Sequence, residues 1–243
     1  MITMIKRLLP EAVKAPFRRI ISKNSLMLSQ AGQDYWVFGE VFNEKRCGYF
    51  LDIGAHDGIN ISNTYLLESK YNWAGLCIEA NPNTFLELKK NRRAECINVC
   101  LDDSEGEVNF AMRDVMGGIV DPGLDNAESG TSMDKIIKLK TVPLINVLKE
   151  YKAPSIIDYL TIDVEGAEER ILGKFNFKEY MFRCITIERP TEHLQYLFKN
   201  NGYVLVKEIP GLDCFYVHQD FLKEYKSNLF QFYAQKHLAM RWR

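Results

Sequence analysis

Short, largely apolar runs alternate with amphipathic segments along most of the chain. Five of these runs have the length of a strand: GYFLDIGA at 48–55, AGLCIEA at 74–80, AECINVCL at 94–101, IDYLTIDV at 157–164 and RCITIE at 183–188. Continuous apolar runs of this length are typical of parallel sheets, whose strands are buried on both faces. The pattern therefore predicts a central, mostly parallel sheet.

Segments with helical spacing lie between the apolar runs. They read SNTYLLESKY at 62–71, PNTFLELKKNRR at 82–93, GAEERILGKF at 166–175 and RPTEHLQYLFKNNG at 189–202. Pro82 suits the first turn of a helix, and Gly202 suits the end of one. This alternation of strands and helices predicts an α/β domain.

The pattern changes toward the end of the chain. YVLVKEI at 203–209 and LDCFYVH at 212–218 are strand-like runs separated only by Pro210 and Gly211, which indicates a hairpin rather than a helical crossover. A mostly parallel sheet that finishes with an antiparallel hairpin is the outline of a Rossmann-like class I methyltransferase rather than of a plain dinucleotide-binding domain. EVNFAM at 107–112 predicts one added strand.

We expect one domain at 28–220 between two extensions. Residues 1–27 are predicted to be a basic, amphipathic N-terminal extension, and residues 221–243 a helical C-terminal extension. Within the domain, residues 112–138 are glycine-rich and acidic with little periodicity, which predicts a long loop or excursion. Such loops are often lids over a site, and an insertion without function is the alternative.

Composition and charge narrow the classes of function. The chain has 243 residues and a formal net charge of -1, so no overall basic field attracts nucleic acid, and we expect no nucleic-acid partner. No apolar run reaches the roughly 18 residues that suggest a membrane span, and the N-terminus lacks the pattern of a signal peptide. The 6 scattered cysteines read as free thiols in a reducing compartment, so we expect a cytoplasmic protein.

Basic and apolar residues are mixed at both ends of the chain. Residues 1–27 contain six lysines and arginines and one acid, and the C-terminal FQFYAQKHLAMRWR combines aromatic and basic side chains. Such segments can lie on an anionic membrane surface as a peripheral contact, which would suit a lipid-linked acceptor. Packing of helices on the domain or at a homodimer interface is the alternative that we prefer from sequence alone.

The first apolar run ends in a glycine turn that carries two acids and a histidine. In open α/β sheets, ligands bind beyond the carboxyl ends of the strands. Gly54 lets the backbone turn without a Cβ clash, and Gly58 can adopt a positive φ or permit close approach. Asp52 and Asp57 would repel a pyrophosphate but attract a cation, such as the sulfonium and ammonium groups of S-adenosylmethionine (SAM).

Acids also stand at the ends of the following strand-like runs. Glu79 lies about 20 residues beyond the turn, where a carboxylate can accept hydrogen bonds from both ribose hydroxyls. Asp102 closes the third run, where an acid can accept from an adenine amino group. Asp163 lies at the end of the fourth run and Glu165 directly after it, where they can bind the methionine part of SAM, orient a substrate hydroxyl, act as a base or hold a divalent ion. For Glu79 the alternative is a strand-end acid that faces solvent.

Four motifs carry a resemblance to a known family. FLDIGAHDGINISNTYLLE, GLCIEANP, LTIDVEGAEERIL and ITIERP, in this order and spacing, resemble the FkbM family of SAM-dependent methyltransferases, and LSQAGQDYWV resembles the segment that precedes the first strand in many members. The resemblance covers roughly Leu28 to His218. It implies a Rossmann-like class I fold, SAM as cofactor, and O-methyl transfer, often to sugars or to the glycans, lipids and natural products that carry them.

The resemblance also implies roles for individual residues. Asp52, Gly54, Asp57 and Gly58 would form the SAM loop, Glu79 would bind the ribose, and Asp163 and Glu165 would face the methionine and the substrate. We add as candidates for cofactor contact Gln33, Ala55, Ser62, Asn81 and Asp102. The side chain of Gln33 can fold over the crevice and donate from its amide, whereas a polar linker is the alternative. At His56 many members carry a small polar residue such as Asn.

The catalytic candidates are His56, Asp163 and Glu188. A sugar hydroxyl is a weak nucleophile and benefits from a general base or a metal ion. His56 is the first candidate for the base, and a turn histidine bonded to backbone is the alternative. Asp163 and Glu188 close neighbouring strands and can share a Mg²⁺ ion, since both offer oxygen ligands.

Two functions of other classes stay open. A NAD-dependent oxidoreductase would share the ribose acid, but the turn lacks the third glycine of the dinucleotide fingerprint and is acidic. A non-catalytic scaffold or binding module would share the fold, but it would not need acids at the strand ends.

Overall fold

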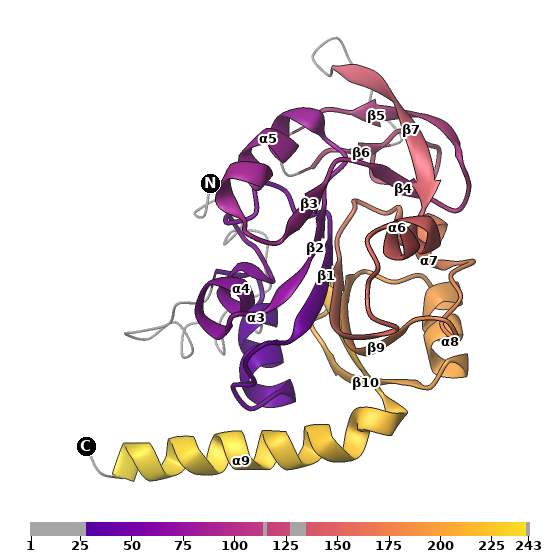
Figure 1. Ribbon diagram of the computed structural model, residues 1–243. Helices are drawn as coiled ribbons and strands as arrows, with labels where there is room; N and C mark the ends of the chain where they lie inside the picture. Colours follow the sequence, from indigo (N-terminus) through magenta and orange to yellow (C-terminus); the bar gives the residue numbers. More distant parts are fainter. Residues whose placement is uncertain (1–27, 114–115, 127–134, 242–243) are drawn as a thin grey trace.

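The structure is a computed structural model that describes residues 28–113, 116–126 and 135–241 (Figure 1). The predicted N-terminal extension at 1–27 lies outside the described residues. A seven-stranded sheet with the order β10-β11-β9-β8-β1-β2-β3 forms the centre. Its strands are β1 (Tyr49–Ile53), β2 (Ala74–Ile78), β3 (Glu95–Ile97), β8 (Ile156–Ile162), β9 (Met181–Glu188), β10 (Tyr203–Glu208) and β11 (Asp213–His218).

The directions of these strands confirm the predicted fold class. Neighbouring strands from β3 to β9 are parallel, whereas β11 runs antiparallel to both β9 and β10. The chain therefore forms an α/β, Rossmann-like class I methyltransferase fold, a mostly parallel central sheet with a C-terminal antiparallel hairpin.

The central strands are mostly apolar because both faces of the sheet are covered. Leu51 and Leu160 pair in register and belong to one core, whereas Phe50 and Tyr159 pair one position earlier and belong to the other. Both faces bury hydrophobic side chains, so the strands show no alternation with polar residues. This explains why the sequence runs predicted the strands well.

Helices cover each face of the sheet (Figure 1). On one face lie α3 (Gln33–Tyr35), its π-helical continuation η1 (Trp36–Val41), α4 (Tyr65–Tyr71) and α5 (Pro82–Asn91); on the other lie α6 (Leu144–Glu150), α7 (Glu168–Leu172) and α8 (Glu192–Asn200). Pro82 takes the first helical position of α5, as predicted, and the side chain of Asn81 caps it by accepting from Asn83 N.

A second, smaller sheet corrects two predictions. It has the order β4-β7-β5-β6 and consists of β4 (Cys100–Asp102), β5 (Gly106–Ala111), β6 (Gly118–Ile119) and β7 (Ile136–Pro143). The run 94–101 is thus not one strand: it breaks at Asn98, whose amide donates to the carbonyls of Glu79 and Ala80 at 2.8 and 3.2 Å. The predicted loop at 112–138 contains β6 and the start of β7.

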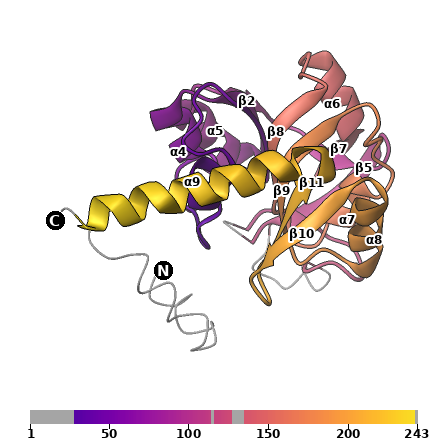
Figure 2. The ribbon, with the colours of Figure 1, turned by 90° about the horizontal axis from the view of Figure 1, so that it is seen from below.

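The C-terminal residues form a long helix. After a short 3₁₀ turn, η2 (Gln219–Phe221), the helix α9 (Leu222–Arg241) crosses one end of the domain and extends beyond it (Figure 2). Within the described residues, neither α9 nor any shorter helix has the length and apolar character needed to cross a bilayer.

Candidate functional site

The glycine turn after β1 brings the ends of two parallel strands into contact. Gly54 has φ +83°, and a Cβ atom on it would lie 1.9 Å from the carbonyl oxygen of Asp163. The amide of Asp163 in turn donates to the carbonyl of Ile53 at 3.1 Å. Because only glycine tolerates both this φ and this contact, the ends of β1 and β8 form one continuous backbone wall.

A cavity opens on one side of this wall, between the carboxyl ends of the strands and the small sheet. It has a volume of ≈ 640 Å³ with its open mouth included. The predicted site residues that line it are Gly54, His56, Glu79, Asn81, Asp163 and Glu165. Apolar side chains complete it: Ile78, Val99, Leu101, Phe110, Ile119 and Ile171.

Glu79 is held rigidly at the edge of this first cavity. Its two carboxylate oxygens accept from the backbone amides of His56 at 2.9 Å and Asn81 at 2.8 Å. Burial raises the pKa of Glu79, although these amides act in the opposite direction. Each oxygen keeps a further lone pair, so the carboxylate can accept two more hydrogen bonds from a ligand.

A second cavity lies on the other side of the Gly54 wall. Four residues border both cavities: Ile53, Gly54, His56 and Asp163. The second cavity is also lined by Asp52, Ala55, Asn60, Ile61, Ser62, Asn63 and Thr161. Asn63 donates to the hydroxyl of Thr161 at 2.8 Å, and its buried Oδ1 accepts from no group of the described residues. A buried acceptor without a donor is uncommon and suits a ligand that brings one.

Carboxylates gather where β8 and β9 end. Oxygens of Asp163, Glu168 and Glu188 lie within 4.8 Å of one another, and oxygens of Asp125, Glu165 and Glu188 form a second such group. We call Asp163, Glu165, Glu168 and Glu188 the acid cluster. The structure thus brings together the Asp163–Glu188 pair that the sequence predicted.

Three carboxyl groups of the acid cluster, those of Asp163, Glu165 and Glu168, have raised pKa values. Burial, aided by neighbouring carboxylates, raises the pKa of Glu165 and of Glu168 to about 7. Burial also raises the pKa of Asp163, and the charge of Glu188 adds to this effect. Carboxyl groups that titrate near neutrality are suited to proton transfer.

Part of the predicted excursion folds over the acid cluster. We call residues 116–126 the covering segment. The guanidinium of Arg189 binds Glu188 at 3.1 Å and also pairs with Asp125 of the covering segment. The amide of Asp125 donates to the carbonyl of Glu165 at 3.3 Å. The covering segment is therefore fastened directly to the acid cluster.

Asp102 does not occupy its predicted position. It closes β4 of the small sheet rather than β3, and Arg170 binds both of its carboxylate oxygens at 3.0 and 2.5 Å. Arg170 also binds Asp121 of the covering segment at 2.8 Å. Because Asp102 lines neither cavity, this geometry corrects its assignment to an adenine amino group, and its observed role is to fasten the covering segment.

Two residues of the glycine turn, Asp57 and Gly58, also lie outside the lining of both cavities. Asp57 accepts from the amides of Ile59 and Asn60, and although burial alone would raise its pKa, these bonds leave the pKa lowered. A Cβ on Gly58 would lie 2.6 Å from Arg92 Cγ, so this glycine allows the turn to pack on α5. Neither contacts the space for a cofactor directly, contrary to expectation.

Three further candidates have partners within the protein. Gln33 accepts from Ala31 N and donates to Asp213 at 2.5 Å, away from both cavities. Ser62 borders the second cavity, but its hydroxyl accepts from Tyr65 N at the start of α4. Asp52 also borders the second cavity, and it accepts from Thr64 Oγ1 at 2.5 Å.

Sequence reasoning missed several residues of the site. They are Asn63 in the second cavity and Asp125 and Arg189 at the acid cluster; it also missed Arg92 and Asp213, which bind predicted site residues from outside the cavities. The acidic character of residues 112–138 was a signal for Asp125, because a lid over the site was one of its two interpretations. Arg92 had no such signal, since a basic pair at a helix end normally faces solvent.

Comparison with known proteins identifies the family. The Methyltransferase FkbM domain matches residues 52–205. Among solved structures, the METTL16 MTase domain has 13% identity and a TM-score of 0.43, with 76% of this chain and 66% of that chain covered. Human methyltransferase 10 domain containing protein has 13% identity and a TM-score of 0.44 (81% and 84% covered). Precorrin-6y C5,15-methyltransferase from Geobacter metallireducens has 9% identity and a TM-score of 0.39 (82% and 94% covered).

No curated protein matches the chain in sequence. The family match extends over more than half of the residues and includes the glycine turn, Glu79 and the acid cluster. It supports a methyltransferase function, for which SAM is the expected cofactor. The chain belongs to the FkbM methyltransferase family.

Proposed function

We propose that this protein transfers the methyl group of SAM to a hydroxyl group of a sugar, on a glycan, a glycolipid or a natural product. The observation that carries the proposal is the pair of cavities on either side of the Gly54 wall, with Glu79 at the far edge of the first and Asn63 inside the second. An elongated ligand with a ribose in one half and an ammonium group in the other fits this arrangement.

The residues of the two cavities suit the parts of SAM. Glu79 has lone pairs for the two ribose hydroxyls, and the apolar side chains around Phe110 and Ile119 suit a flat adenine ring. Asn63 Oδ1 lacks a donor, which an ammonium group would supply. Asp163 borders both cavities, so its carboxyl oxygens can face a sulfonium, whose positive charge would favour the ionised form of this group.

When bound, SAM supplies an activated methyl group, so the protein mainly has to align the acceptor and remove its proton. His56 borders both cavities, and so does Asp163 of the acid cluster. Either His56 or a carboxylate of the acid cluster can accept the proton of a sugar hydroxyl. Glu165 is the carboxyl group of the cluster that lines the first cavity and has its pKa raised to about 7, which suits a base at neutral pH.

A divalent ion is a second way to activate the hydroxyl. The oxygens of Asp163, Glu168 and Glu188 lie close enough to share an oxygen-preferring ion such as Mg²⁺. Thermal unfolding at neutral pH with Mg²⁺, and separately with a chelator, tests this. A rise of the unfolding temperature with Mg²⁺ that Glu188→Gln removes supports the ion, and equal temperatures in all samples contradict it.

Cofactor binding is tested by calorimetry with SAM, its demethylated product and NAD. We expect binding of SAM and of the product, and a loss of about tenfold or more in affinity for Glu79→Ala, because hydrogen bonds to a charged group are worth about 1.5–3 kcal/mol. Glu95→Ala, which removes an exposed carboxylate of β3, is the matched control and should bind as the parent does. Binding of NAD alone would favour the oxidoreductase.

Methyl transfer is tested with SAM that carries a labelled methyl group. The protein is incubated with glycan and lipid fractions, and the labelled products are hydrolysed to locate the methyl group. Label on a sugar oxygen supports the proposal. Label only on nitrogen or carbon contradicts O-methylation, and SAM binding with no transfer to any fraction favours the scaffold.

A further inference from the structure

The charge of this protein is strongly divided between its ends and its middle. Residues 1–27 carry six basic side chains and one acid, and residues 226–243 carry four basic side chains and no acid. Since the whole chain has a formal net charge of -1, residues 28–225 carry a net charge of -10. A near-neutral total therefore hides two basic ends on an acidic domain, and such asymmetry is typical of chains with an anionic partner.

One face of α9 attaches it to the domain. Phe232 is buried and packs against Tyr35 with 5.5 Å between ring centroids. A Cβ on Gly39 of η1 would lie 2.4 Å from Phe232, so the two helices approach as closely as a glycine allows. Asn228 donates to the carbonyl of Val41 at 2.8 Å. These contacts fix the orientation of α9 and determine which side chains face outward.

A different face of α9 exposes Phe230 beside a lysine. Phe230 is 76% exposed, whereas Tyr233 is 43% exposed and its hydroxyl donates to a carboxylate oxygen of Glu40 in η1 at 2.8 Å. With Lys226 and Ala234 the two aromatic residues lie at helical spacing and, together with Leu229, line a shallow apolar groove. We call Lys226, Phe230, Tyr233 and Ala234 the outer face of α9. Figure 2 shows that the C-terminal half of the helix extends past the domain.

We infer that the outer face of α9 binds the surface of an anionic lipid bilayer. A helix that lies on a bilayer needs apolar side chains on one side and basic residues to attract anionic headgroups. Phe230 is exposed for insertion, the partly exposed ring of Tyr233 flanks it, and Lys226 stands beside them. The sequence adds Lys236 and Arg241 within the same helix and no acid after Glu224.

An anionic surface suits this face better than a second copy of the chain does. A symmetric dimer through α9 would place two basic outer faces against each other, and these would repel. This inference rests on surface and charge, and it holds whether or not the proposed sugar methylation is correct. A membrane-bound enzyme would reach acceptors that are attached to lipid.

The test is co-sedimentation of the full chain with vesicles of phosphatidylcholine alone and of equal parts phosphatidylcholine and phosphatidylglycerol. We expect sedimentation with the anionic vesicles only, and its loss at high salt, because the attraction between exposed charges is screened. Phe230→Ser should lower the partition coefficient about tenfold, since it removes an aromatic side chain from the apolar phase. Lys226→Glu should lower it to a similar degree by reversing a charge near the lipid.

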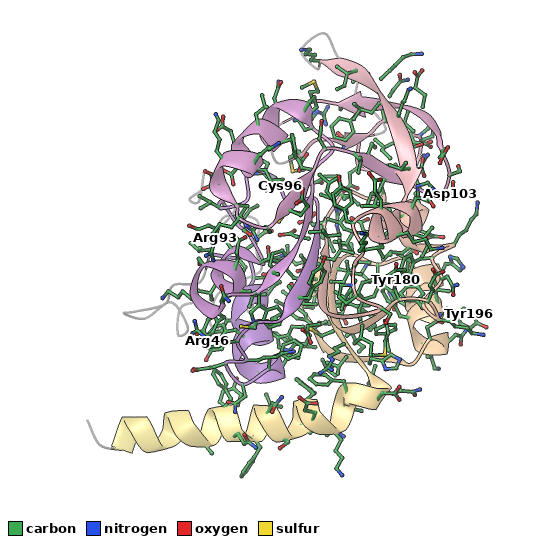
Figure 3. All side chains as sticks on the ribbon, viewed as in Figure 1. Arg46, Arg93, Cys96, Asp103, Tyr180 and Tyr196 are labelled. Atoms are coloured by element: carbon green, nitrogen blue, oxygen red, sulfur yellow. The ribbon has the colours of Figure 1, made fainter. Side chains whose placement is uncertain are left out.

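The matched control is Tyr196→Ser on α8. Tyr196 is 65% exposed and lies on the side of the molecule away from the free end of α9 (Figure 3). It should bind anionic vesicles as the parent does. Circular dichroism of each variant checks that it is folded, and Lys226→Glu changes no apolar contact, so it keeps the test valid if Phe230→Ser unfolds.

Three outcomes would overturn the inference. The first is equal sedimentation with neutral and anionic vesicles. The second is a dimer, seen by light scattering, that Phe230→Ser dissociates while vesicle binding is absent, because the outer face would then be an interface between copies. The third is a monomer that binds no vesicle, which would mean that the outer face has no lipid partner.

Discussion

Two groups of buried carboxylates lie near the glycine turn, and they differ in where their cation is. Beneath the turn, Arg92 has a fully buried side chain and binds Glu68 at 2.6 Å and Thr64 at 2.8 Å, with Asp52 at 3.8 Å. In the acid cluster, the cation is Arg189, which is 45% exposed and lies at the rim. We call Asp52, Thr64, Glu68 and Arg92 the Arg92 network.

The difference separates charges that hold the fold from charges that are available for chemistry. In the Arg92 network, a central guanidinium compensates the carboxylates, and breaking such a pair leaves a buried charge without a partner. In the acid cluster, burial and mutual repulsion raise the pKa values of Glu165 and Glu168 to about 7. Carboxyl groups with such raised pKa values are often found at functional sites.

The strongest test of this comparison removes Arg92. We expect Arg92→Met to lower the free energy of unfolding by about 3–5 kcal/mol, because two buried carboxylates lose their cation. Urea unfolding measures it. Arg93→Met is the control: its side chain is 69% exposed and the expected change is below about 1 kcal/mol (Figure 3). Equal losses in both variants would contradict a structural role specific to Arg92.

The second test addresses Glu168. Its pKa is raised from 4.5 in the unfolded chain to about 7 in the folded one, so the folded protein binds more protons between these values. The stability due to this group is fully present below pH 4.5 and is lost as the pH rises through 7. The loss amounts to about 3 kcal/mol at most. Glu168→Gln should remove it, so urea unfolding across this range should show a flatter pH dependence than the parent.

The third test addresses Asn63, a neutral side chain whose buried Oδ1 accepts no hydrogen bond within the described residues. Asn63→Leu removes the buried Oδ1 that we assign to the ammonium group of SAM. We expect about a tenfold loss of SAM affinity, corresponding to one charged hydrogen bond, in calorimetry. Asn60→Leu is the control from the same cavity, since its side-chain amide already donates to Asp57. An unchanged SAM affinity in the Asn63 variant would place the ammonium elsewhere.

The smallest effect on stability is expected for the exposed ion pair between Asp125 and Arg189, at the edge of the acid cluster. Asp125→Asn removes the exposed ion pair between the covering segment and Arg189. Surface pairs contribute little, so the free energy of unfolding should fall by less than about 1 kcal/mol. Thermal unfolding measures this change. A loss as large as that of the Arg92 variant would mean that the acid cluster is held together like the Arg92 network.

The fold could be predicted from the sequence where burial alone decides it. Strands covered on both faces, such as β1 and β8, are mostly apolar, and the Pro210–Gly211 pair marks the hairpin. The small sheet escaped because β7 is half exposed and rich in lysine, which resembles a polar loop. The break between β3 and β4 depends on Asn98, whose bonds to Glu79 and Ala80 no local pattern reveals.

In the candidate site, the residues at the strand ends could be predicted from the sequence, whereas those with distant partners could not. The strand ends were enough to place Gly54, Glu79, Asp163 and Glu165 around one cavity. Asp102 and Gln33 were placed wrongly because distant partners, Arg170 and Asp213, compete for their side chains. Position along a strand determines which edge of the sheet a residue reaches, but the partners that it meets there determine where its side chain points.

The contact at Gly54 has a consequence for engineering. The ends of β1 and β8 cannot separate without losing a backbone bond, and no side chain fits between them. The cofactor half of the site is thus a fixed template, whereas residues 121–126 join it through the ion pairs of Asp121 and Asp125 and the backbone bond of Asp125. Libraries that vary residues 121–126 can therefore search for new acceptors while Ile119 and the residue at 54 stay constant.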